Sequence, residues 1–285
     1  MKQILILFGL IFILHPTFGQ KRLDIPKTRV VESFIKTLPK KIRELDLKDL
    51  RTSTDSLNIR IWQTHEVFTI NYNNATFSNY KIYTTNEKLV FKTFKISEQI
   101  SKNIMDSLLV SRVMNLKNED YRGVDGGFVF IEISTKNSYK IVSFWSPNSE
   151  RSDDCKTVVQ ILGMLDKTVD TGNLKSEFLN SLSSGSYRWG MTSIRIDRFL
   201  DKDVSKTDFY YRDGKRMRRE LNITDKTDHW NFPLILVDKE TAKISDLNKY
   251  TNKQIAKFEI LKPNNNSTAI YGYNGSNGVV LIELK

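Results

Sequence analysis

The C-terminal stretch from Pro233 to Lys285 constrains the fold most. It contains three short apolar runs rich in β-branched residues, and glycine and asparagine turns separate them. The runs are Leu234–Val237, Lys257–Leu261 and Val279–Leu284. Runs of this length and composition, bounded by turn residues, are typical of β-strands. We expect them to form a compact sheet of their own, with a turn or short helix at 268–271 between the last two.

Four segments of this stretch follow one another in a recognisable order: 233–238, 258–262, 269–272 and 277–282 with Lys285. They carry a motif made of Pro233, Asp238, Glu259, Lys262, Tyr271, Gly272, Asn277 and Gly278. This pattern resembles the plug domain of TonB-dependent outer-membrane receptors, in the form common among Bacteroidota. The resemblance implies a plug-like fold, a structural role for the motif residues and a cell-envelope setting.

The pattern departs from the family in two respects. The family has a glycine after the first strand, where this chain has Lys239. The sequence also stops where the membrane barrel of a receptor would begin, and no segment is identified as the box that engages TonB. A barrel needs many long amphipathic strands, so the resemblance implies a plug-like module and does not imply transport.

The first nineteen residues are typical of a secretory signal peptide. Lys2 provides the positive n-region, 4–14 is an uncharged apolar run, and the small residues Thr17 and Gly19 precede a cut before Gln20. The run is too short to span a bilayer, and no later apolar run is long enough to do so. We therefore expect an exported protein, in the periplasm or at the cell surface, without a transmembrane segment in the mature chain.

The cysteine content and the net charge indicate the compartment of the protein and the kind of partner it could have. Cys155 is the single cysteine, so we expect a packed and unreactive thiol in an amphipathic helix, and an exported chain without disulfides is typical of bacteria. The net charge of +11 indicates an anionic surface as a partner, or only keeps the chain soluble. In an exported protein that surface would be an anionic membrane or an acidic glycan, and not nucleic acid.

The chain before the C-terminal stretch has the pattern of an α+β domain. Alternating and β-branched runs predict strands at 57–62, 67–72, 80–84 and 89–94, and a hairpin pairing 128–134 with 139–145. Periodic apolar residues predict a helix that Pro39 ends, a second from an N-cap at Ser97 to about Leu116, and a third capped by Asp153 or Asp154.

The softest composition lies at 180–186, within the stretch 171–190, and we place the domain boundary there. The predicted organisation is an α+β chain with an N-terminal α+β domain at 20–182. A small plug-like α/β domain with a mixed sheet follows at 187–285.

Candidate catalytic residues are few. His65 and His229 are the histidines left after the signal peptide, which is too few for a zinc site, and we interpret His229 as a packed or surface imidazole. The carboxylates Glu132 and Asp125 lie on one hairpin, and Glu132 reads as the polar position of an alternating strand. We expect no catalytic residue, metal or cofactor. The alternative is a periplasmic hydrolase acting on envelope polymers, which an acidic cleft between the hairpin 128–145 and the helix from Ser97 would favour.

The densest basic run is 212–219, which we interpret as a hairpin turning at Asp213-Gly214. Its candidate anion-binding residues are Arg212, Lys215, Arg216, Arg218 and Arg219. Such side chains bind phosphate or carboxylate groups, although they also occur on solvated hairpin tips. We therefore expect a non-catalytic binding or scaffolding protein of the cell envelope, associated with outer-membrane receptor and transport systems and docking onto an envelope protein.

Overall fold

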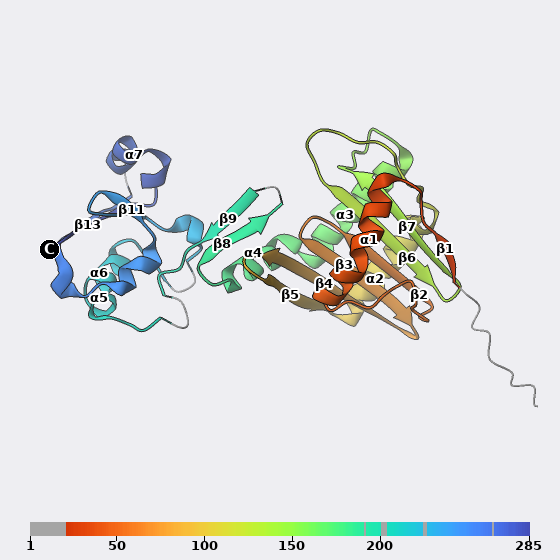
Figure 1. Ribbon diagram of the computed structural model, residues 1–285, viewed down its shortest axis with the longest axis horizontal. Helices are drawn as coiled ribbons and strands as arrows, with labels where there is room; N and C mark the ends of the chain where they lie inside the picture. The colour runs from red at the N-terminus through yellow and green to blue at the C-terminus, as the bar shows by residue number, and fades with distance from the viewer. Residues whose placement is uncertain (1–20, 191, 201–203, 225–226, 264) are drawn as a thin grey trace, which may run out of the picture. The chain divides into compact units, whose positions relative to one another are not determined.

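The computed structural model describes residues 21–190, 192–200, 204–224, 227–263 and 265–285 (Figure 1). The predicted signal peptide, 1–19, lies outside the described residues. Two compact units make up the chain: Met1–Trp62, Phe68–Ser78 and Ser97–Val158 form the first, and Gln63–Val67, Asn79–Ile96 and Val159–Lys285 form the second. Helices and mixed sheets occur together, which confirms the predicted α+β class. No helix in these described ranges is both long and apolar enough to cross a bilayer.

The first unit contains a sheet segment in the order β1-β7-β6-β2. Its strands are β1 (Arg22–Asp24), β2 (Leu57–Trp62), β6 (Phe128–Thr135) and β7 (Ser138–Trp145). The β6–β7 hairpin and the β2–β6 pair are antiparallel, whereas β1 runs parallel to β7. The predicted strand at 57–62 and the predicted hairpin are confirmed. Consecutive residues of these strands are buried, so both faces of this part of the sheet are covered.

Helix α1 (Arg29–Glu44) continues through Pro39, so the prediction that this proline ends the helix is wrong. The apolar spacing of Val31, Phe34 and Leu38 carries on past the proline to Leu45, and all four side chains are buried. Phe34 stacks on Phe130 of β6 with a ring-centroid distance of 4.0 Å. Packing of this face against the sheet outweighs the local cost of proline, whose side chain lies on the exposed face.

Two further helices start near the predicted caps. Ser97 caps α2 (Glu98–Val110), and its Oγ accepts a hydrogen bond from the Ile100 amide at 3.4 Å, as expected. The helix ends at Val110, and a short 3₁₀ turn, η1 (Val113–Asn115), follows it. At α3 (Asp153–Val169) the cap is Ser152, whose Oγ accepts from the Cys155 amide at 3.1 Å, and not Asp153 or Asp154.

The second unit contains a segment in the order β5-β4-β8-β9. Its elements are β5 (Leu89–Ile96), α4 (Thr171–Ser181), β8 (Gly185–Trp189) and β9 (Thr192–Ile196), with the end of β4 (Ala75–Thr85). The other long strand of the chain is β3 (Glu66–Asn73). The soft stretch at 171–190 therefore forms a helix and a strand, and β8 pairs with β4 at Thr85 and Arg188. The boundary between 20–182 and 187–285 stays a prediction.

The end of the second unit, residues 197–285, is called here the C-terminal module. Its sheet has the order β11-β10-β13-β12, separate from the longer sheet, as expected from the sequence. The strands are β10 (Leu234–Val237), β11 (Glu240–Ala242), β12 (Ile255–Leu261) and β13 (Val279–Leu284). The β10–β13 pair is parallel and the other two pairs are antiparallel, so the sheet is mixed as predicted.

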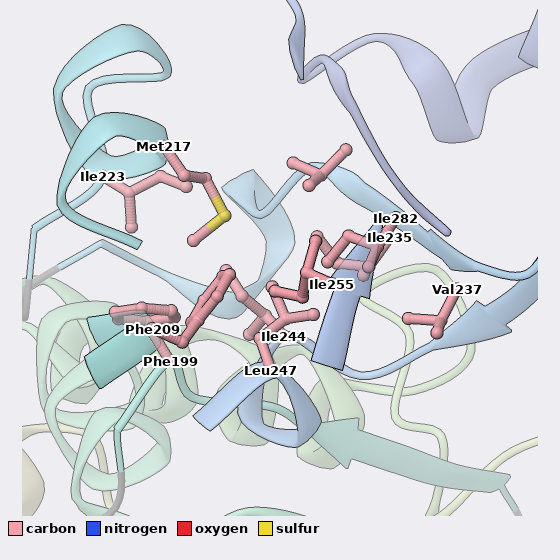
Figure 2. Close-up of a cluster of buried hydrophobic side chains, with 11 residues drawn as sticks. Phe199, Phe209, Met217, Ile223, Ile235, Val237, Ile244, Leu247, Ile255 and Ile282 are labelled. Atoms are coloured by element: carbon pink, nitrogen blue, oxygen red, sulfur yellow. The ribbon is translucent and has the colours of Figure 1, made fainter. Parts of the chain in front are cut away.

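Short helices complete the module: α5 (Asp208–Tyr211), α6 (Asp213–Glu220) and α7 (Asn265–Tyr271), with 3₁₀ turns η2 (His229–Asn231), η3 (Ile244–Lys249), η4 (Asn252–Gln254) and η5 (Gly272–Gly275). Figure 2 shows the buried apolar side chains that join these helices to the sheet, among them Phe209, Met217 and Ile235. Phe209 and Met217 are fully buried, although they come from the short helices and not from a strand. The module therefore has an apolar core of its own.

The predicted hairpin at Asp213-Gly214 is wrong, because α5 and α6 occupy this stretch. A Cβ at Gly214 would lie 2.9 Å from the Phe199 ring and 3.0 Å from the Phe209 carbonyl oxygen. The glycine therefore permits close packing of two helices and does not form a strand turn. Helical spacing turns Met217 into the core, which outweighs the local preference of Asp-Gly for a hairpin.

A two-residue turn at Asp238 and Lys239 connects β10 to β11, since Val237 pairs with Glu240. Both turn residues have positive φ, 49° and 72° respectively. This is the geometry for which hairpins prefer Asn-Gly or Asp-Gly. Lys239 therefore holds a left-handed conformation at the position where the plug family has glycine.

We predict that Lys239→Gly raises the free energy of unfolding by about 0.5–1 kcal/mol, because glycine adopts positive φ without the steric cost of a Cβ. Urea unfolding followed by circular dichroism measures the change. Lys215→Gly within α6 is the control and should lower stability by about 1 kcal/mol. A Lys239→Gly protein that is no more stable than the parent would contradict the assignment of this turn.

Candidate functional site

Both ring nitrogens of His65 have partners among the described residues. Among them, no group of three His, Cys, Asp or Glu side chains is placed to hold a metal ion. The Nδ1 atom of His65 lies 2.9 Å from the Tyr83 carbonyl oxygen, and its Nε2 accepts a hydrogen bond from the Gly190 amide. The imidazole also stacks on Trp189, with ring centroids 4.7 Å apart. Both nitrogens are therefore engaged in structure, and the side chain of His229 lies outside the description.

Glu132 is fully buried, so its interpretation as an outward polar residue of an alternating strand is wrong. It lies directly opposite Arg60 in the β2–β6 register, and both side chains are removed from solvent. The Glu132 carboxylate accepts hydrogen bonds from Trp62 Nε1 at 2.6 Å and from the Tyr139 hydroxyl at 2.9 Å. Asp125, the other carboxylate of the predicted pair, is exposed before β6.

Arg60 completes this buried network. Its Nη1 lies 3.5 Å from Glu132 Oε2, its Nε donates to Thr69 Oγ1 at 3.1 Å, and its Nη2 donates to the Lys48 carbonyl at 2.8 Å. Burial lowers the pKa of the Arg60 guanidinium, and the charge of Glu132 opposes that effect. Burial, followed by the negative charge of Glu132, raises the pKa of the Tyr139 hydroxyl. The charged and polar groups of this network are buried and hydrogen-bonded to one another or to the backbone, so the network links β2, β3, β6 and β7 from within.

We predict that Arg60→Met lowers the free energy of unfolding by about 3–5 kcal/mol, because it leaves the Glu132 carboxylate buried without its cation. Adding Glu132→Gln to this variant removes the orphaned charge and keeps acceptor capacity for Trp62 and Tyr139. The double variant should therefore be more stable than Arg60→Met alone in urea unfolding. Strictly additive losses from the two changes would show that the pair is not coupled.

Cys155 is fully buried in α3, in agreement with the prediction of a packed thiol. Its Sγ donates to Glu119 Oε1 at 3.0 Å, and Glu119 also pairs with Arg151 at 3.1 Å. Burial raises the pKa of the thiol, which reduces the thiolate population that reacts as a nucleophile. The residue therefore has a packing role.

The first unit contains a groove of about 470 Å³ between α2 and the 72–76 segment that joins β3 to β4. Its walls combine apolar side chains with a charged rim. The lining residues are Leu57, Tyr72, Asn74, Ala75, Thr76, Glu98, Lys102, Met105, Asp106 and Leu109. This volume is within the range of small-molecule sites. Sequence reasoning missed the groove, because segments distant in the chain form it.

The groove differs from the acidic cleft that a hydrolase requires. It lies beside the β3–β4 connection and not between the β6–β7 hairpin and α2. Glu98 and Asp106 are eight positions apart on α2, which places their backbones about 12 Å apart along the helix axis. Paired glycosidase carboxylates are about 5–9.5 Å apart. Lys102 also lies between them on the same helix face. The lining of the groove therefore carries two carboxylates and one cation along the same face of α2.

The plug-like motif residues lie at turns and strand ends of the C-terminal module. Pro233 is buried before β10, and Asp238 Oδ1 accepts a hydrogen bond from the Leu284 amide of β13 at 2.9 Å. Gly278 precedes β13 with φ of 94°, and a Cβ there would lie 2.9 Å from the Leu261 carbonyl oxygen. Glu259 lies 3.3 Å from Lys257, and Lys262 is exposed after β12. Pro233, Asp238 and Gly278 therefore shape the turns and strand ends, whereas Glu259 and Lys262 lie at the surface.

The corner of the motif lies between α7 and β13. Gly272 has φ of 64°, but Asn277 is not among the residues with positive φ. Instead, the Asn277 side-chain amide donates to the Trp230 carbonyl at 2.8 Å. Tyr271 is half-buried, whereas Tyr273 is 89% exposed.

Three large apolar side chains in the segments next to this corner are exposed. Ile270 of α7 is 70% exposed, and Trp230, which Asn277 holds beside the turn, is 61% exposed. We call Trp230, Ile270 and Tyr273 the corner surface. Exposed groups of large apolar side chains mark interaction sites more often than isolated ones do.

The five candidate anion-binding residues are not equivalent. Arg212, Lys215, Arg216 and Arg219 are exposed. Arg218 is partly buried, with its guanidinium 3.8 Å from the Tyr210 ring centroid and 4.9 Å from that of Phe199. Its Nη2 donates to the Tyr210 carbonyl at 3.2 Å. Arg218 therefore fastens α6 to the module. Of the other four, Arg216 pairs with Glu220 at 2.8 Å, and all four remain exposed to solvent.

Comparison with known proteins gives no family or relative from which a function could be inferred. The chain matches no model of a known protein family and no curated protein.

Proposed function

We propose that this chain is an exported cell-envelope protein whose C-terminal module docks onto another envelope protein. It acts as a non-catalytic binding or scaffolding component associated with outer-membrane receptor and transport systems. The setting rests on the signal-peptide pattern of 1–19 and on the plug-like motif, both of which are features of the sequence.

The observation that carries the proposal is the corner surface. Trp230, Ile270 and Tyr273 expose apolar area on a module whose own core is already closed. Covering such side chains with a partner removes apolar area from water, which favours association. Plug domains fit into a protein-lined cavity, and we propose that this module presents its corner surface to a partner in a comparable way.

Replacing the apolar side chains of the corner surface should weaken binding of the partner protein. We predict that Ile270→Ser/Tyr273→Ser weakens capture of an outer-membrane β-barrel protein from envelope extracts by about tenfold or more, because aromatic and aliphatic anchors dominate interface energies. Tagged full-length protein is incubated with the extract, and bound proteins are quantified by mass spectrometry.

The control variant is Val110→Ser/Val124→Ser, which changes two residues that are 83% and 95% exposed in the first unit. Substitutions at such exposed positions change stability by less than about 0.5 kcal/mol. The proposal fails if the parent protein enriches no outer-membrane protein. It also fails if the corner variant captures the same protein as strongly as the control does.

A periplasmic hydrolase is the second candidate, and the groove with Glu98 and Asp106 is the observation that favours it. If the groove only binds, the purified protein should release no soluble fragments from peptidoglycan or envelope polysaccharide. Fragment release that Glu98→Gln or Asp106→Asn abolishes, with unfolding unchanged, would establish the hydrolase and reject the non-catalytic assignment.

A further inference from the structure

Helix α6 places four basic side chains on one face. Arg212 is the N-cap residue, whose own dihedral angles are not helical, and its carbonyl accepts the first helical hydrogen bond, from the Arg216 amide at 3.1 Å. Lys215, Arg216 and Arg219 follow at positions i+3, i+4 and i+7. At 3.6 residues per turn these four side chains fall within an arc of about 100°. We call them the basic face.

The rest of the helix is fixed to the core, which keeps the basic face outward. Gly214 and Met217 are buried on the opposite side, against Phe199 and Phe209. Arg218 lies on the flank and stacks on Tyr210. Figure 2 shows Met217 directed into the cluster that contains Phe209. The helix therefore cannot rotate its cations inward without opening the core.

The charges on this face are poorly neutralised. Arg216 pairs with Glu220 at 2.8 Å, whereas Arg212, Lys215 and Arg219 form no ion pair within the described part of the chain. The hydrogen bond from Arg216 lowers the pKa of the Glu220 carboxyl, and the positive charges of Lys262 and Arg219 act in the same direction. Lys262 therefore extends the positive region beyond the helix. Tyr211, beside Arg212, is 62% exposed.

We propose that the basic face of α6 binds the surface of an anionic lipid bilayer through the phosphate groups of its lipids. A flat helical surface with several separate cations matches a plane of headgroups, where each Lys or Arg strengthens binding about fivefold. An exposed tyrosine suits the membrane–water interface. The net charge of +11 adds attraction at longer range. An acidic protein would instead require paired carboxylates arranged to match these four positions.

Sedimentation with lipid vesicles tests this proposal on the full mature chain. Vesicles of phosphatidylcholine alone are compared with vesicles that contain about 30 mol % phosphatidylglycerol, at about 0.05 M and about 0.5 M salt. We expect binding to the anionic vesicles only, and loss of that binding at the higher salt. The variant Arg212→Gln/Lys215→Gln/Arg219→Gln should bind about 100-fold more weakly, because three charges are removed.

The matched control is Lys36→Gln/Lys136→Gln/Lys167→Gln, which removes the same net charge at exposed positions outside the module. It should retain binding to within about threefold, since these lysines lie off the basic face. Equal losses in the two triple variants would show that net charge alone acts, and the proposal would fail. Failure to bind anionic vesicles, or binding to an immobilised acidic polypeptide without vesicle binding, would also overturn it. The corner surface is unchanged in both variants, so partner capture separates this result from the proposed function.

Discussion

Strand β13 is hydrogen-bonded along both of its edges, to β10 in parallel and to β12 in antiparallel orientation. The parallel pairing joins segments more than forty residues apart, so the intervening turns and helices must all close correctly before it forms. Gly278 directly precedes β13 and has a positive φ, which glycine adopts without strain. At the other end of the strand, the Leu284 amide donates a hydrogen bond to the Asp238 carboxylate. The corner surface depends on the entry point at Gly278, and the buried side chains of β13 join the core against which α6 packs.

The strands were predictable because each carries its own local signal. The β2, β10 and β13 runs match the expected residues, since short runs rich in β-branched residues and bounded by turn residues are typical of strands. The errors arose where tertiary packing outweighed a local signal. Pro39 lies inside α1 because the helix buries Leu38 and Leu45 on either side of it. This packing cannot be read from the residues next to the proline.

The environment of Glu132, the groove and the basic face were less predictable, because each depends on segments that are distant in the sequence or on the conformation of the chain. Glu132 reads as a surface residue unless its register opposite Arg60 is known. The groove beside α2 needs the β3–β4 connection to be placed against the helix. The basic run 212–219 was recognised in the sequence, but its conformation determines which of its side chains point in the same direction. On a hairpin its residues alternate between two sides, whereas on α6 four of them share one face and Arg218 is held against Tyr210.

The account depends most directly on β13 as the central strand of a separate C-terminal sheet. Amide hydrogen exchange of the full chain, resolved by peptide mass spectrometry, measures this property. We predict that the amides of Val279–Leu284 exchange at least about a thousandfold more slowly than in an unstructured peptide, with weaker protection in the edge strand β11. Exchange in Val279–Leu284 within about tenfold of the unstructured rate would contradict the account.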